Sequence, residues 1–483
     1  MPRALLIAYY FPPIQEVGGF RTLRFAKFLP DFGWQPSVLT VSPESVHERV
    51  DAGLLEQCPE TIAIRRTQVF NPVKLLRKAL GAVRRIRRRP VASDASGSEK
   101  RSSLPSVAAP PAKRWRTSLF ETIFCTPDAK VWWVPSAVRA GLKMIRAERP
   151  DVLYTSGPPH STHLVGLILN RLTGIPWVPD FRDPWARCPW DGNSRPRWRG
   201  ALDSALERAS IRRGSAVVLN TDATVDEFAR HYRTLPASKF VAIPNGYDPD
   251  LQALVAEFER DAESRASSGP FRLCHAGDLY GKRSILPLVK AIAILSKAGL
   301  KVELAQFGNC DDSAALAEAI GDLGLEGKVI LHEKIPHREA LREMAGADLL
   351  VAIQPGTALQ IPGKLYEMML FDKPLLVLAD GGATAELVSA RGLGQVASCN
   401  DPLQIADVIR SISKGPVAGR NAGAGRAGVA EFDGRSLTGR LAALFSAVCG
   451  VAAAAEADFS GAGHLRQSEV RGGTALAGVE HQN

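Results

Sequence analysis

The 483-residue sequence lacks the patterns that define several common protein classes. It has no run of eighteen or more apolar residues, and its N-terminus lacks the apolar core of a secretory signal. The seven cysteines are odd in number, widely spaced and without any C-x-x-C pair, which argues against disulfides and zinc sites. The nine histidines form no H-E-x-x-H pattern. We therefore expect a cytoplasmic protein that holds no metal.

The net charge of +10 is concentrated in one insertion. Residues 74–116 contain thirteen Lys and Arg but only two acidic residues, so the remainder of the chain is close to neutral. Nucleic-acid-binding proteins place basic residues on a folded face together with stacking aromatics, and this block has no such surface. We therefore expect no nucleic-acid partner.

The first part of this insertion has the pattern of a basic amphipathic helix. Residues 73–89 place Val73, Leu76, Leu80 and Val83 along one helical stripe, flanked by basic residues. Such a helix is typical of contact with an anionic membrane surface, here at the inner face of the membrane. A solvated basic helix followed by a flexible loop is the alternative.

Short apolar segments alternate with helical patterns along most of the chain, which predicts α/β domains with parallel sheets. One series begins with the apolar strand ALLIAYY and a second begins with FRLCHAG. Two Rossmann-like domains would enclose a cleft at the carboxyl ends of their strands. The expected parts are a first domain (1–250), a linker (251–270), a second domain (271–430), a helix (431–450) and a disordered tail (451–483).

Three groups of residues follow strands, where such folds bind ligands. Gly18 and Gly19 leave room for an anion at a helix start, although neither G-x-G-x-x-G nor G-x-x-x-x-G-K-[ST] is present, and alone they favour a structural turn. In HAGDLYGKRS, Lys282 and Arg283 follow a glycine turn and suit a diphosphate; a solvated pair is the alternative.

The third group is QIPGKLYEMML. Pro362 suits a first helical position, and Lys364 and Glu367 then share one helix face at i, i+3. A carboxylate facing a cleft accepts both hydroxyls of a ribose. A surface ion pair is the alternative interpretation.

A family resemblance is carried by the segments FPPIQEVGGFRTLRFAKFL, DVLYTSGPPHSTHLV, FVAIPNGYDPD, HAGDLYGKR and IPGKLYEMMLFDKPLLVL. With these segments in order, the sequence resembles the glycosyltransferases of family 4 over residues 1 to about 445. The resemblance implies the GT-B fold, two facing Rossmann-like domains. It also implies that Gly18 and Gly19 close on the donor diphosphate opposite Lys282 or Arg283. Glu367 would bind the ribose, residues 354–363 would lie beneath the sugar, and the turn 332–336 would hold the base.

The sequence departs from the family at two positions. Leu359 replaces the first Glu of the E-x₇-E pattern, and Ser156 stands where many relatives carry a histidine. His160 is the preferred replacement for that histidine, because His163 is expected to be packed. Asp183, in DFRDPW, either pairs with Arg182 or orients an acceptor hydroxyl.

The resemblance implies transfer of a sugar from a nucleotide-sugar to an acceptor hydroxyl with retention, in polysaccharide or glycolipid assembly. Catalytic roles are expected for His160, Asp183 and Arg283, and no cofactor is needed beside the nucleotide-sugar. Electrostatic support of the leaving diphosphate carries such a reaction. The alternatives are a nucleotide-sugar 2-epimerase of the same fold and a degenerate glycosyltransferase that acts as a binding subunit.

Overall fold

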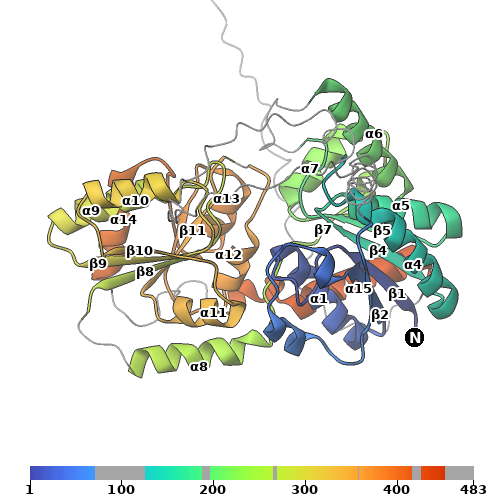
Figure 1. Cartoon of the computed structure of the whole chain (residues 1–483), viewed down its shortest axis with the longest axis horizontal. Coiled ribbons are helices and arrows are strands. Elements are labelled where there is room, and N and C mark those ends of the chain that lie inside the picture. Colours follow the sequence, from blue (N-terminus) through green and yellow to red (C-terminus); the bar gives the residue numbers. More distant parts are fainter. Residues whose placement is uncertain (71–125, 188–195, 265–268, 357, 416–425, 452–483) are drawn as a thin grey trace, which may run out of the picture.

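The structure is a computed structural model that describes residues 1–70, 126–187, 196–264, 269–356, 358–415 and 426–451. It has two α/β domains side by side, as predicted (Figure 1). The basic insertion 74–116 and nearly all of the predicted tail 451–483 lie outside the described residues. Among the helices of the described residues, none is long and apolar enough to cross a bilayer.

The N-terminal domain is built on a seven-stranded, all-parallel sheet in the order β3-β2-β1-β4-β5-β6-β7. Its strands are β1 (Arg3–Ala8), β2 (Gln35–Val41), β3 (Ala63–Thr67), β4 (Val152–Gly157), β5 (Trp177–Phe181), β6 (Val217–Leu219) and β7 (Phe240–Ala242). Its helices are α1 (Val17–Phe28), α4 (Val134–Glu148), α5 (Ser161–Thr173), α6 (Arg197–Arg213) and α7 (Asp222–His231). Both faces of the central strands are buried, which is why they read as continuous apolar runs.

The C-terminal domain repeats this design with six parallel strands in the order β10-β9-β8-β11-β12-β13. The strands are β8 (Phe271–Ala276), β9 (Val302–Phe307), β10 (Val329–His332), β11 (Leu349–Ile353), β12 (Leu375–Leu378) and β13 (Gln395–Ala397). The helices are α9 (Leu286–Lys297), α10 (Ser313–Asp322), α11 (His337–Ala345), α12 (Gly363–Met368), α13 (Gly382–Ala390) and α14 (Pro402–Lys414). The strand order reverses between β8 and β11, and between β1 and β4, so a ligand crevice is expected at each reversal.

Two helices connect the domains. Helix α8 (Leu251–Ser264) occupies most of the segment predicted as a linker and packs beside α11 (Figure 1). Helix α15 (Gly434–Cys449) returns to the N-terminal domain, where Leu437, Leu441 and Phe445 join the core under α1. The C-terminal helix of the chain therefore belongs structurally to the first domain.

The two chain crossings between the domains run side by side. The Tyr247 amide donates to the Phe432 carbonyl at 3.1 Å, and the Gly434 amide donates to the Tyr247 carbonyl at 2.9 Å. A β-carbon on Gly246 would lie 2.2 Å from the Phe432 carbonyl oxygen. Only glycine therefore permits this close approach of the two backbones.

A buried ion pair fixes α1 to the sheet. Arg21 Nε lies 2.7 Å from Asp180 Oδ2, and the two side chains are 2% and 0% exposed. Arg21 also donates to the Ile243 and Pro244 carbonyls, at 2.7 Å each. The Asp180 carboxylate in turn accepts hydrogen bonds from the Tyr154 and Ser156 hydroxyls. One guanidinium thus joins the start of α1, the end of β5 and the segment after β7.

We predict that Asp180→Asn lowers the free energy of unfolding by about 3–5 kcal/mol, because Arg21 would keep a buried charge without its counter-ion. Urea unfolding followed by circular dichroism measures this change. The control is Asp407→Asn, which removes an exposed i, i+3 pair with Arg410 and should cost below about 1 kcal/mol. Equal losses in the two variants would contradict the role given to the buried pair.

Candidate active site

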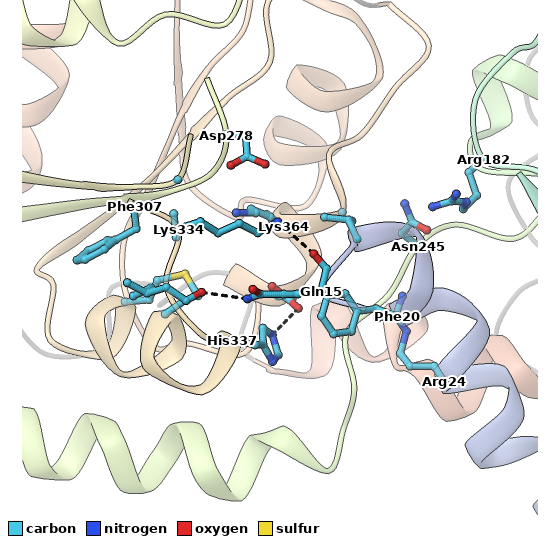
Figure 2. Close-up of a pocket in the computed structure, with 18 residues that line it drawn as sticks. Gln15, Phe20, Arg24, Arg182, Asn245, Asp278, Phe307, Lys334, His337 and Lys364 are labelled. Carbon is cyan, nitrogen blue, oxygen red and sulfur yellow. Dashed lines mark hydrogen bonds and ion pairs between the residues drawn. The ribbon is translucent and has the colours of Figure 1, made fainter. Parts of the chain in front are cut away.

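A pocket lies in the cleft between the two domains (Figure 2). The N-terminal domain contributes the segment before α1, α1 itself and the segments after β5 and β7. The C-terminal domain contributes the segments after β8, β9 and β10 together with α11 and α12. The lining residues are Gln15, Val17, Phe20, Arg24, Arg182, Asn245, Ala276, Asp278, Phe307, Gly308, Lys334, Ile335, His337, Ala340, Met344, Gly363, Lys364 and Glu367.

Lys364 and Glu367, predicted as ligand-binding residues, both line this pocket. Helix α12 begins directly after Pro362, and the i, i+3 spacing places both side chains on the face toward the cleft. Glu367 Oε1 lies 3.0 Å from His337 Nε2, at the first residue of α11. Phe20 of α1 packs on the His337 ring, with the two ring centres 5.0 Å apart. The N-terminal domain therefore covers the pair of Glu367 and His337.

The charges around Glu367 determine its ionisation. Burial alone would raise the pKa of Glu367, but His337, Lys364 and Arg24 outweigh it and hold the pKa below its usual value. Burial lowers the pKa of His337, but the Glu367 carboxylate more than compensates, so the pKa is raised overall. Burial lowers the pKa of Lys364 despite Glu367, and lowers that of Arg24 to about 10. An ionised carboxylate surrounded by cations suits a polyhydroxylated, anionic ligand.

Hydrogen bonds cross the cleft at the turn after β10. Gln15 Nε2 donates to the Ile335 carbonyl at 3.0 Å, and Lys334 Nζ donates to the Gln15 carbonyl at 3.1 Å (Figure 2). The His337 amide donates to Asp51 at 3.3 Å. The turn 332–336, expected to hold a nucleotide base, therefore lines the pocket and contacts the opposite domain.

Asp183 and Arg283, predicted to be catalytic, lie at the two ends of one chain of polar side chains. Arg283 Nη2 donates to Gln354 at 2.6 Å, Gln354 approaches Gln360 at 3.5 Å, and Gln360 donates to Asp183. This chain joins the two domains beside the pocket but does not line it. Burial raises the pKa of Asp183, although Arg182, Gln360 and Arg283 oppose that rise. Lys282 is exposed.

The histidines after β4 lie away from the pocket. His160 stacks on Trp185 with ring centres 5.1 Å apart, and it does not line the pocket. His163 is fully buried, its Nδ1 lies 2.9 Å from the Thr155 hydroxyl, and burial lowers its pKa to about 3. The prediction that His163 is packed is therefore confirmed. Ser156 donates to Asp180 and supports the buried ion pair.

Gly18 and Gly19 lie in the first turn of α1. A β-carbon on Gly18 would lie 2.7 Å from both terminal nitrogens of the Arg182 guanidinium, and one on Gly19 would lie 3.3 Å from the Phe11 backbone. The two glycines thus make room for Arg182 and for the preceding segment. Arg182 lines the pocket next to them.

Several pocket residues were not identified from the sequence. Arg24 follows Phe20 by one helical turn, so the two share the face of α1 toward the cleft, a spacing that the sequence does contain. Lys334 lies within the turn 332–336 that the family resemblance implied, but its contact with Gln15 and the position of His337 at the start of α11 depend on how the domains meet, which no sequence signal records.

The Glu367–His337 pair generates a pH prediction. His337, with a raised pKa, stabilises the fold fully below about pH 6.5, and this contribution is lost as the pH rises through its folded-state pKa. The difference in unfolding free energy between the wild type and His337→Gln should therefore be larger at pH 6 than at pH 9. The difference in unfolding free energy between the wild type and Glu367→Gln should likewise be larger at pH 6 than at pH 9. A difference that does not change with pH in either variant would contradict the ion pair.

Comparison with known proteins gives one match to the N-terminal domain and several matches to nearly the whole chain. Residues 18–246 match the model of the glycosyl transferase 4-like domain. No curated protein matches the chain by sequence. Among solved structures, Anabaena HepE in complex with UDP has a TM-score of 0.57 at 17% identity, covering 92% of this chain and all of HepE.

Two further structures have the same architecture. Sucrose-phosphate synthase from Thermosynechococcus elongatus has a TM-score of 0.62 at 16% identity, covering 93% of this chain and 99% of its own. WaaG, a glycosyltransferase involved in lipopolysaccharide biosynthesis, has a TM-score of 0.56 at 17% identity, covering 92% of this chain and 99% of WaaG. These likenesses confirm the predicted GT-B fold. The chain therefore has the GT-B fold, and its N-terminal domain matches the glycosyl transferase 4-like domain over residues 18–246.

Proposed function

We propose that the chain transfers a sugar from a nucleoside diphosphate sugar to a hydroxyl of an acceptor, with retention of configuration. The observation that carries the proposal is the pocket at the reversal points of both sheets, where Glu367 is surrounded by cations from the two domains. Arg24 and Arg182 come from the N-terminal domain, and Lys334 and Lys364 from the C-terminal domain. These cations suit a diphosphate bound across the cleft.

The donor is arranged along this pocket. Glu367 accepts the ribose hydroxyls, and Lys364 faces the diphosphate together with Arg24. The base lies toward Phe307, Ile335 and Met344, where the lining is mostly apolar. HepE has been solved with UDP and with UDP-glucose, which makes UDP-sugars the first donors to test.

The reaction depends on stabilising the departing diphosphate, and Arg283, with the adjacent Lys282, supplies further positive charge for this step. Gly18 and Gly19 close on the diphosphate at the start of α1, and Gly18 leaves room for Arg182 to approach it from the N-terminal domain. Asp183, held by Gln360, orients the acceptor hydroxyl for attack on the same face of the sugar. His160, whose ring stacks on Trp185 two residues after Asp183, acts on the acceptor in this proposal. The nucleotide-sugar is the co-substrate, and no other cofactor or metal takes part.

The acceptor is a growing polysaccharide or glycolipid. A lipid-linked acceptor would explain the basic insertion 74–116, whose amphipathic pattern suits an anionic membrane surface. Contact at the inner face of the membrane would bring a chain of this kind to its acceptor.

The direct test follows nucleoside diphosphate release from UDP-, GDP- and ADP-sugars with and without candidate acceptors. Release that depends on an acceptor supports a transferase. Interconversion of the donor sugar without an acceptor would instead indicate a 2-epimerase. Donor binding without turnover would indicate a degenerate binding subunit, a possibility raised by Leu359 in place of the family's first glutamate.

We predict that Glu367→Gln raises the donor KM by about 10- to 150-fold, the effect of losing about 1.5–3 kcal/mol from charge-assisted hydrogen bonds. The control is Glu386→Gln, an exposed carboxylate on α13, which should leave the KM unchanged. Steady-state kinetics at saturating acceptor measure both. An unchanged KM in Glu367→Gln would remove Glu367 from the donor site.

A further inference from the structure

Helix α6 buries both of its carboxylates and exposes two of its large apolar side chains. Its two carboxylates, Asp203 and Glu207, are 0% and 1% exposed. Two of its large apolar side chains, Trp198 and Leu202, are 42% and 41% exposed, whereas Ile211 is buried and Leu206 packs against the core. Helices on the surface of a globular protein normally place apolar residues inward and charges outward. The orientation of α6 therefore calls for a separate explanation of each face.

The inner face is explained by hydrogen bonds to the segment after β5. Trp185 Nε1 donates to Asp203 at 3.1 Å, and the Ala186 amide donates to Glu207 at 2.8 Å. The Tyr232 hydroxyl also donates to Glu207, at 2.6 Å. The buried carboxylates thus hold the chain that follows Asp183, and this role fixes which side of α6 faces inward.

The outer face has apolar residues at one end and only positive charges along its length. We define the α6 outer face as Arg197, Trp198, Leu202, Arg208, Arg212 and Arg213, all of which are exposed. Because both acidic residues of α6 are buried, this face carries no carboxylate. Figure 1 shows α6 at the upper edge of the N-terminal domain, beside α7.

We propose that the α6 outer face is a docking surface for an anionic membrane. Tryptophan is favoured at the headgroup level, where Leu202 can insert beside it, and each arginine near the surface gains attraction to anionic lipid. A two-fold contact between copies of this chain would place the same arginines against one another, which like-charge repulsion opposes. One exposed aromatic ring is too few for a single-stranded nucleic acid, which stacks successive bases.

The α6 outer face would add a membrane contact to the proposed function. This inference rests on the proposal that the acceptor is linked to lipid. The buried carboxylates of α6 hold residues 185–187, which follow Asp183 on the proposed acceptor side of the cleft. Docking through α6 would therefore bring the acceptor side close to the bilayer. This contact is independent of the insertion 74–116, because it uses only residues of a packed helix.

The test is sedimentation of the full chain with vesicles of phosphatidylcholine alone and of phosphatidylcholine with an equal part of phosphatidylglycerol. One variant, Trp198→Ser with Leu202→Ser, removes the apolar part of the surface. A second variant, Arg197→Gln with Arg208→Gln and Arg212→Gln, removes most of its positive charge. The control removes three exposed lysines of the C-terminal domain, Lys290→Gln with Lys297→Gln and Lys301→Gln. Circular dichroism and thermal melting establish that each variant is folded.

We expect the wild type to bind the anionic vesicles, and to bind them less as salt rises. Each α6 variant should lower the partition coefficient at least tenfold, and the control should change it less than twofold. Activity on a water-soluble acceptor should stay unchanged in the α6 variants, so loss of docking and failure of the proposed reaction are distinguishable. Equal losses in the control and the α6 variants, or a partition coefficient that stays within twofold of the wild type in both α6 variants, would overturn the proposal. A change in dimerisation without a change in vesicle binding would also overturn it.

Discussion

The buried pair of Arg21 and Asp180 is the interaction on which the arrangement of the N-terminal domain depends. Asp180 ends a central strand, and Arg21 lies one turn into α1, so their pairing holds α1 across the carboxyl end of the sheet. The hydrogen bonds from Arg21 to the carbonyls after β7 position Asn245 at the same place. Phe20 and Arg24, which flank Arg21 on α1, are thereby directed toward the opposite domain.

The second domain meets this surface with groups of complementary charge and shape. Phe20 covers His337, which holds Glu367. Across the cleft, Gln15 donates to the Ile335 carbonyl and its own carbonyl accepts from Lys334. The C-terminal domain supplies the Glu367 carboxylate with Lys334 and Lys364, and the N-terminal domain adds Arg24 and Arg182. The return of α15 to the core of the first domain ties the far end of the chain to α1. The chemistry of the site is therefore a property of the closed pair of domains.

The sequence predicts the architecture well because buried parallel strands and their helices carry strong local patterns. It misses β3, whose AIRRT sequence lies at a sheet edge, and it leaves α8 as a linker because half of that helix faces solvent. Lys364 and Glu367 are placed correctly in the pocket, since their spacing on a helix after Pro362 is local information. Lys334, His337 and the partnership of Gln354 with Arg283 depend on contacts between distant segments, which no local pattern records.

A crystal structure of the chain with UDP tests most directly the claim that both domains build one donor site. The account predicts that the ribose hydroxyls lie within hydrogen-bond distance of Glu367, and that cations of both domains, Lys364 and Arg24 or Arg182, contact the diphosphate. A nucleotide bound outside the cleft, or held by one domain alone with Glu367 still paired only to His337, would contradict it.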